Sequence, residues 1–275
     1  MHINHMAQAD IPLKRGYGRF WMDTCGGRDQ VAMSLLSKGW SAYEAPMPEI
    51  LAAWNEAFAP VFIDVGANTG FYSLLALASG ASHVHAFEPV ESIFKILSHN
   101  LEMSEFLPNV TLHHFAVAEQ SDQKTLYFPT GEHGLIETSA SLNRDFRSRH
   151  SAEEVVKCVA IDDVFHSMDF KSSPVILKID VEMLEDKVLR GAWRFITECR
   201  PVIFSEILPG AELDVFEELC SSLSYVHCSL SKSGMEKEEK IVASNINRDH
   251  LFLPAEGLFE WLSKEIRWGK RCTNG

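Results

Sequence analysis

A turn framed by two glycines is the first feature of this sequence that could do chemistry. Residues 64–70 (DVGANTG) follow an apolar run and precede a helical stretch. Glycine lets backbone N–H groups approach a ligand closely, and a helix N-terminus adds unpaired donors. The turn has neither the Gly-x-Gly-x-x-Gly spacing of dinucleotide sites nor the Lys-Ser/Thr of phosphate loops. Because an acid, Asp64, stands at its start, the turn favours a ligand with a positive amino group, such as S-adenosylmethionine.

A second acid, Glu88, ends the next apolar run, 24 residues after Asp64. An acid at this place in a nucleotide-binding fold hydrogen-bonds the ribose hydroxyls of an adenosine ligand. Pro89 follows and forces the chain out of the sheet. The alternative is that Glu88 only caps the following helix.

Lys178, Asp180 and Glu182 alternate at the end of the apolar run 175–179. Alternation places the three side chains on one face of an extended segment. Three charges on one face of a buried strand are costly unless they are paired or functional. The carboxyl end of such a strand is where open α/β sheets bind ligands, and the alternative is a salt-bridged strand end.

Alternating strands and helices position these residues. Short, continuously apolar runs are typical of parallel strands buried on both faces. The pattern predicts an α/β fold with a doubly wound, mostly parallel sheet. We expect strands at 61–65, 83–87, 110–115, 175–179, 201–204 and 225–230, and helices at 69–79, 90–103, 184–196 and 211–222. An extra strand pair at 124–128 and 155–161 flanks a polar loop, 129–154, which we interpret as an active-site cover.

Three segments follow from this reading. Residues 1–55 are irregular and then helical from Pro48, and could form a substrate cap; residues 56–255 form the main domain; and residues 256–275 form a tail. The net charge of −13 opposes nucleic acid and anionic membranes as partners. No window reaches the roughly 20 apolar residues of a membrane span, and no secretory signal is visible, so we expect a cytoplasmic protein. The six cysteines include no Cys-x-x-Cys pair, which opposes a zinc site or a disulfide framework.

Several segments together resemble the FkbM-type S-adenosylmethionine-dependent methyltransferases. Residues 64–73 (DVGANTGFYS) resemble the first motif of that family, and residues 86–89 (AFEP) resemble the second. The most distinctive likeness is KIDVE at 178–182, followed by Glu185 and by VLRGA at 188–192. Residues 109–118, the segment 200–203 with Glu206, and the pair Tyr43-Glu44 also match, so the likeness runs from about 43 to about 254. One departure is Met183-Leu184, where the family usually has Gly-Ala.

The resemblance implies a Rossmann-like class I methyltransferase with a seven-stranded sheet and S-adenosylmethionine as cofactor. It implies that the methionine end of the cofactor lies against Asp64, Gly66, Asn68 and Gly70, above the helix that begins with Phe71 and Tyr72. Glu88, followed by Pro89, would hold the ribose. The adenine would lie beside Ala116 and Val117, and Ser139 would belong to a Ser/Thr-rich patch near the site.

Methyl transfer to an alcohol needs a base to take the hydroxyl proton. Asp180 and Glu182 are the candidates, Lys178 could orient them, and Glu206 could bind the acceptor or complete a metal site. Mg²⁺ stays open but is not favoured. We therefore expect an O-methyltransferase that acts on a hydroxyl or carboxyl of a small-molecule, sugar or peptidic acceptor. The alternatives are a non-catalytic adenosine-binding module, a nucleic-acid methyltransferase and a nicotinamide-dependent oxidoreductase.

Overall fold

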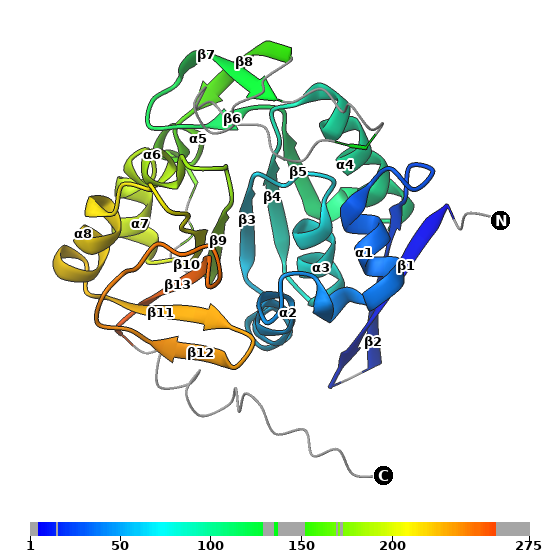
Figure 1. Cartoon of the computed structure of the whole chain (residues 1–275), viewed down its shortest axis with the longest axis horizontal. Coiled ribbons are helices and arrows are strands. Elements are labelled where there is room, and N and C mark those ends of the chain that lie inside the picture. The colour runs from blue at the N-terminus through cyan, green and yellow to red at the C-terminus, as the bar shows by residue number, and fades with distance from the viewer. Residues whose placement is uncertain are drawn as a thin grey trace.

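The computed structural model describes residues 5–14, 16–128, 135–136, 152–168, 170 and 173–256. Five short strands, most of them from the apolar runs, build the parallel part of its central sheet (Figure 1). Every residue of the strand at 175–179 is buried, as expected for a parallel strand covered on both faces. In spatial order these strands are β5 (Val110–His113), β4 (His83–Phe87), β3 (Val61–Val65), β9 (Val175–Ile179) and β10 (Val202–Glu206).

Beyond β10 the sheet continues with three more strands. β13 (Asp249–Pro254) pairs antiparallel with β10 on one side and with β11 (Tyr225–Ser231) on the other. β12 (Gly234–Lys237) then pairs antiparallel with β11. The expectation of a mostly parallel sheet with seven strands is therefore wrong in number, because β12 adds an eighth strand. The sheet is mixed because β13 runs antiparallel to both of its neighbours, as β12 does to β11.

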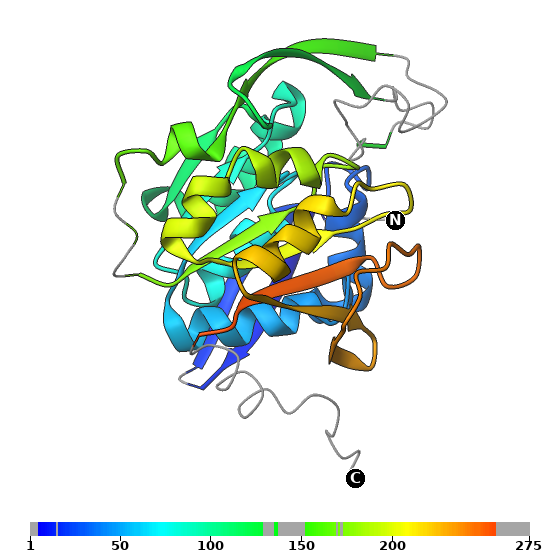
Figure 2. The same cartoon turned by 90° about the vertical axis from the view of Figure 1, so that its left-hand side faces the viewer.

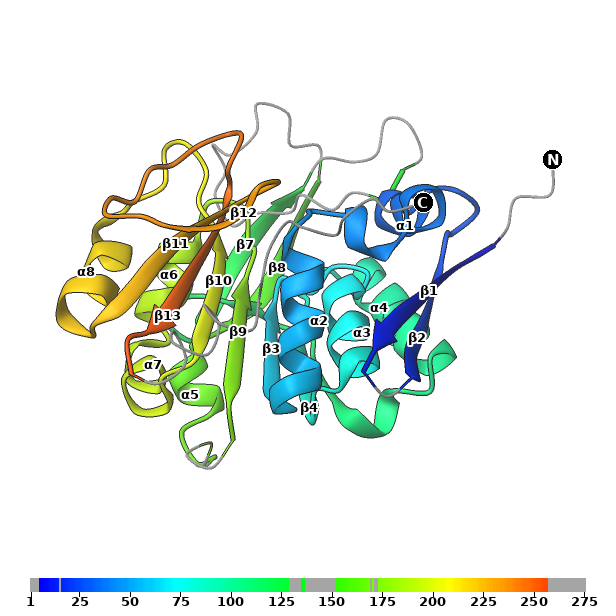
Figure 3. The same ribbon diagram turned by 90° about the horizontal axis from the view of Figure 1, so that it is seen from below.

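Helices cover both faces of the sheet (Figure 3). On one face lie α2 (Met47–Phe58), α3 (Phe71–Ser79) and α4 (Glu91–Met103), with α1 (Gln30–Lys38) beside them. On the other face lie α5 (Ile161–Val164), α6 (Glu185–Arg190), α7 (Trp193–Cys199) and α8 (Asp214–Ser222). The single helix expected at 184–196 is broken at Gly191, where a Cβ would lie 2.2 Å from the Ala118 carbonyl oxygen. Short 3₁₀ turns occur at Trp40–Ala42 and Leu107–Asn109.

The N-terminal segment contains a β-hairpin that the sequence analysis missed. β1 (Met6–Leu13) and β2 (Gly16–Asp23) pair antiparallel and pack against α3 and α4. The expectation of irregular structure was wrong here, because two of the three buried residues of β1, Ala7 and Ala9, are small and make its alternation weak. One hydrophobic core joins this hairpin to α2, α3 and the main sheet, on both sides of the boundary expected after residue 55.

A small second sheet projects from one end of the molecule (Figure 2). β7 (Asp122–Phe128) and β8 (Ala152–Val159) form the expected extra strand pair, and the two-residue strand β6 (Ala116–Val117) pairs with β8. Most of the expected cover loop, 129–154, lies outside the described residues. Within the described part of the chain, no helix is both long and apolar enough to cross a membrane.

Candidate active site

The carboxyl ends of the parallel strands surround a cavity of about 250 Å³. This edge is where open α/β sheets bind ligands. The structure brings most of the expected site residues to the cavity wall: Gly66, Asn68, Phe71, Tyr72, Glu88, Pro89, Ala116, Val117, Lys178, Asp180, Glu182 and Glu206. Ser139 lies outside the described residues.

The turn after β3 and the loop after β9 lie in direct backbone contact. The Asp180 N–H donates to the Val65 carbonyl at 3.0 Å, and the Gly66 N–H donates to the Phe87 carbonyl at 3.1 Å. Gly66 has a φ of +82°, and a Cβ built on it would lie 1.9 Å from the Asp180 carbonyl oxygen. Glycine is required at this position, and the close approach sets the location of Asp180 relative to the turn.

Glu88 lies at the cavity wall with its carboxylate almost fully buried. It accepts hydrogen bonds from the Asn68 N–H at 3.0 Å and from the Val90 N–H at 2.8 Å. The second bond fits the helix-capping alternative, since α4 begins at the next residue. A carboxylate has about four acceptor positions, so capping leaves others for a ligand. Burial raises the pKa of Glu88 to about 7, although both backbone donors oppose this shift.

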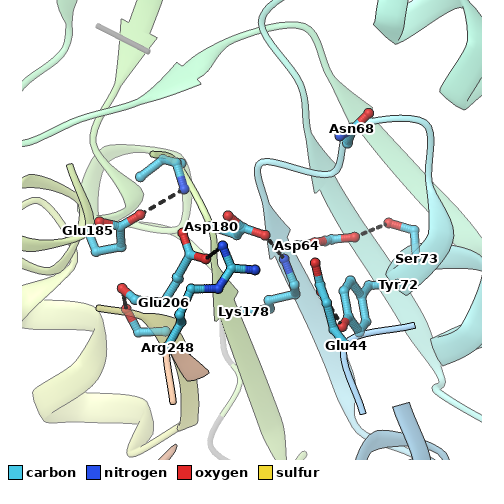
Figure 4. Close-up of polar contacts among 12 residues, drawn as sticks. Glu44, Asp64, Asn68, Tyr72, Ser73, Lys178, Asp180, Glu185, Glu206 and Arg248 are labelled. Carbon is cyan, nitrogen blue, oxygen red and sulfur yellow. Dashed lines mark hydrogen bonds and ion pairs between the residues drawn. The ribbon is translucent and has the colours of Figure 1, made fainter. Parts of the chain in front are cut away.

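Lys178 and Asp180 form an ion pair on the other side of the turn (Figure 4). The Lys178 Nζ lies 3.1 Å from the Asp180 Oδ2 and 4.6 Å from the ring centre of Tyr72. Burial lowers the pKa of Lys178, but the carboxylates of Asp180, Asp64 and Glu44 outweigh burial and hold the pKa above its usual range. The ammonium group is therefore a permanent cation in the wall of the cavity.

Two of the expected residues, Asp64 and Gly70, do not line the cavity. Asp64 is fully buried behind the wall, and its Oδ2 accepts a hydrogen bond from the Ser73 hydroxyl at 2.7 Å (Figure 4). Burial raises the pKa of Asp64, and the charge of Lys178 opposes this. Gly70 caps the start of α3 with a φ of +103°. Asp64 therefore supports Lys178 from behind the wall, and Gly70 joins the turn to α3.

Glu44 is a cavity residue that the sequence analysis noted only as part of a family pattern. The Tyr72 hydroxyl donates to its Oε2 at 2.7 Å (Figure 4). Burial and then the nearby Asp180 raise the pKa of Glu44. Its neighbour Tyr43 also lines the cavity and packs edge-on against the Phe71 ring at 4.9 Å. The segment before α2 thus supplies part of the wall.

Arg248, which the sequence analysis missed, lines the cavity beside Glu206. Its guanidinium lies 3.1 Å from the Glu206 Oε1 (Figure 4). Burial and then Asp180 raise the pKa of Glu206 to about 9, and Arg248 opposes this rise. Arg248 immediately precedes β13, an antiparallel strand, so the start of β13 meets the carboxyl ends of the parallel strands. No motif marks this residue in the sequence.

The loop that carries Glu182 has an unusual backbone. Glu182 and Met183 both lie in the left-handed region, with φ of +57° and +76°. The Val181 N–H donates to the Glu185 carboxylate at 3.0 Å, which ties the loop to the start of α6 (Figure 4). Glycine adopts a positive φ without strain, which gives a physical reason for the glycine that the resembling family has where Met183 stands.

The two ends of the cavity differ in character. Apolar side chains beyond β4 line one end, from Ile93, Phe115 and Leu126. Charged side chains line the other end, from β9 and the loop after it, from β10, and from Glu44 and Arg248. Within the described part of the chain, no group of three or more His, Cys, Asp or Glu residues is arranged to hold a metal ion.

The chain is similar to one protein family and to several solved structures. The family model of the methyltransferase FkbM domain matches residues 64–233. The methyltransferase FkbM from Methylobacillus flagellatus KT is 19% identical, with a TM-score of 0.45, over 70% of this chain and 43% of that one. The chain therefore spans less than half the length of that protein.

Two further solved structures are more distant. A putative O-methyltransferase from Klebsiella pneumoniae is 10% identical, with a TM-score of 0.41, over 76% of this chain and 80% of that one. The O-methyltransferase TomG from Streptomyces achromogenes, in complex with SAM, is 9% identical, with a TM-score of 0.42, over 77% and 80%. No curated protein matches the chain. The match to the family model covers more than half of the sequence, and the chain belongs to the FkbM methyltransferase domain family.

Proposed function

We propose that this protein transfers a methyl group from S-adenosylmethionine to a hydroxyl or carboxyl oxygen of a small-molecule, sugar or peptidic acceptor. The observation that carries the proposal is the arrangement of one cavity. Glu88 lies at one side of the Gly66 turn, and the Lys178–Asp180 ion pair lies at the other. The family membership of the chain supports the reaction class.

The residues present fit the cofactor. The close approach of Gly66 to the Asp180 carbonyl leaves no room for a side chain, so the backbone itself forms the surface of the turn. Glu88 keeps acceptor positions that suit the two ribose hydroxyls. Apolar side chains beside Ala116 and Val117 suit an adenine ring. The carboxylates near Lys178 suit the positive charges of the methionine part.

When bound, S-adenosylmethionine supplies an electrophilic methyl group with a good leaving group, so positioning of the acceptor accounts for much of the rate. Asp180 takes the proton of the acceptor hydroxyl as the oxygen attacks. Lys178 fixes the orientation of Asp180 through the 3.1 Å ion pair. Glu182 and Glu206 line the same end of the cavity and would contact the acceptor.

The experiment that tests this proposal is calorimetric titration of a Glu88→Ala variant with S-adenosylmethionine. Losing hydrogen bonds to a charged group costs about 1.5–3 kcal/mol, so we expect the Kd to rise roughly 10- to 100-fold. Glu91→Ala is the matched control, because Glu91 is an exposed acid three residues along that pairs with Lys95. Circular dichroism shows whether the fold is kept. An unchanged Kd for Glu88→Ala refutes the ribose role.

A further inference from the structure

One side of α4 and of the residue that caps it joins the turn after β3 to the N-terminal hairpin. Leu97, Asn100 and Ser104 are spaced three and four residues apart, which places them on the same side of a helix. A Cβ built on Gly70 would lie 2.7 Å from Leu97 Cδ1, so Leu97 packs against the end of the turn. The Ser104 hydroxyl accepts a hydrogen bond from the Trp21 N–H at 3.0 Å. The helix therefore contacts the turn at one end of this row and the hairpin at the other.

Asn100, in the middle of the row, bridges the two segments with its side-chain amide. Its Nδ2 donates to the Thr69 carbonyl at 2.8 Å, and its Oδ1 accepts from the Asp23 N–H at 2.8 Å. The residue is fully buried. Because a buried amide group without partners is costly, these two bonds fix its orientation. The Asn100 amide thus connects the backbone of the turn to the end of β2.

The turn has a backbone conformation that needs support from its surroundings. Gly66, Asn68 and Gly70 all have a positive φ, of +82°, +52° and +103°. Asn68 is not a glycine, and the left-handed region is costly for such a residue. This conformation persists only where neighbouring groups fix it. Thr69, which accepts the hydrogen bond from Asn100, lies between Asn68 and Gly70, so the bond holds the turn at its strained part.

The part of the turn that Asn100 holds belongs to the wall of the cavity. Asn68 and Thr69 both line the cavity. The Asn68 N–H donates to the Glu88 Oε2 at 3.0 Å, and the Asn68 Oδ1 accepts from the Thr69 N–H at 2.7 Å. A shift of Thr69 therefore also moves the N–H group that orients the Glu88 carboxylate.

We propose that Asn100 is a positioning residue for S-adenosylmethionine, which ties the turn to the N-terminal hairpin and so sets the geometry of Asn68 and Glu88. Asn100 does not line the cavity, so it acts through the turn. The hairpin then contributes to cofactor binding without contacting the cofactor. The inference rests on the proposed function and adds a residue to its cofactor site.

Asn100→Ala and Asn55→Ala form a matched pair of variants. Asn55 is also fully buried, and its Nδ2 donates to the Ser79 hydroxyl at 3.0 Å, which joins α2 to α3 away from the cavity wall. Both variants should lose stability in urea unfolding. Calorimetric titration with S-adenosylmethionine should give a Kd about fivefold or more above wild type for Asn100→Ala, and a wild-type Kd for Asn55→Ala. A wild-type Kd for Asn100→Ala, or an equal rise in both variants, overturns the inference.

Asn100→Asp provides a second test if the alanine variant does not fold. The substitution keeps the size of the side chain and an acceptor for the Asp23 N–H. At pH 8 a carboxylate oxygen would replace the donor beside the Thr69 carbonyl, so the Kd should again rise about fivefold or more. An unchanged Kd contradicts the positioning role.

Ser104→Ala separates the Asn100 amide from the attachment of the hairpin as a whole. It removes the bond to Trp21 and leaves the bond to Thr69, so the Kd should stay at the wild-type value. A rise as large as that of Asn100→Ala would show that hairpin attachment alone governs binding, and would overturn the inference. The wild-type titration separates the two proposals. If the wild-type chain binds the cofactor and Asn100→Ala binds it equally well, only the positioning role fails; if the wild-type chain does not bind it, both proposals fail.

Discussion

Replacing Gly66 by alanine should disturb both stability and the active site. The new Cβ would lie 1.9 Å from the Asp180 carbonyl oxygen, at a residue with a φ of +82°. The left-handed backbone costs a non-glycine residue about 1–2 kcal/mol, and an overlap with packed backbone adds about 1–3 kcal/mol. We therefore expect a loss of about 2–5 kcal/mol in the free energy of unfolding, measured by urea denaturation.

Gly26→Ala is the matched control for this substitution. Gly26 also has a positive φ, +71°, but nothing lies within 4 Å of a Cβ built on it. The Gly26→Ala variant should lose only the free energy of unfolding that the left-handed backbone costs alanine, about 1–2 kcal/mol. Calorimetry should also show weaker S-adenosylmethionine binding for Gly66→Ala alone, because the 178–182 loop must move. If both variants lose the same stability and bind the cofactor equally, the close approach does not shape the site.

Three other substitutions test separate parts of the account. Asp180→Asn should abolish turnover and leave the S-adenosylmethionine Kd within a few-fold; joint loss of binding and turnover, measured by calorimetry and product assay, would make Asp180 part of the cofactor pocket. Burial, with His227 beside it, lowers the pKa of His250 from 6.5 to about 4, so stability is complete above about pH 6.5 and is lost as the pH falls towards 4. His250→Phe should flatten this loss in urea unfolding across that range, and an unchanged pH slope argues against the buried neutral imidazole. Met183→Gly relieves a φ of +76° and should raise the unfolding free energy by about 1 kcal/mol; a destabilised variant would show that packing of the Met183 side chain outweighs the strain.

The parallel strands were predictable because their sequences are continuously apolar. The expected ranges 61–65, 83–87 and 175–179 agree with β3, β4 and β9 residue for residue. Burial on both faces leaves few other conformations for such runs. The ends of helices were less predictable, since capping depends on neighbours such as Ala118 beside Gly191.

The mixed part of the sheet was not predictable in the same way. β13 follows a polar segment and becomes a strand because it fills the space between β10 and β11. The hairpin β1–β2 was hidden because two of the three buried residues of β1, Ala7 and Ala9, are small and make the alternation of that strand weak. In both cases tertiary packing, more than local preference, selects the strand.

The residues of the candidate site likewise divide into those that motifs predict and those that only the tertiary structure reveals. Glu88, Lys178 and Asp180 stand at strand ends next to recognisable motifs, and the structure places all three at the cavity. Asp64 lies in the same motif, but the alternation of β3 points its side chain towards Ser73 behind the wall. Arg248 reaches the cavity from a segment where a charged residue looks like ordinary surface.

The most direct test of the central claim is a calorimetric titration of the full chain with S-adenosylmethionine, with NAD⁺ as the control ligand. The account predicts saturable binding of S-adenosylmethionine in the micromolar range and no binding of NAD⁺. Binding of NAD⁺ in preference, or of neither ligand, would contradict the assignment of the Gly66 turn and Glu88 to this cofactor.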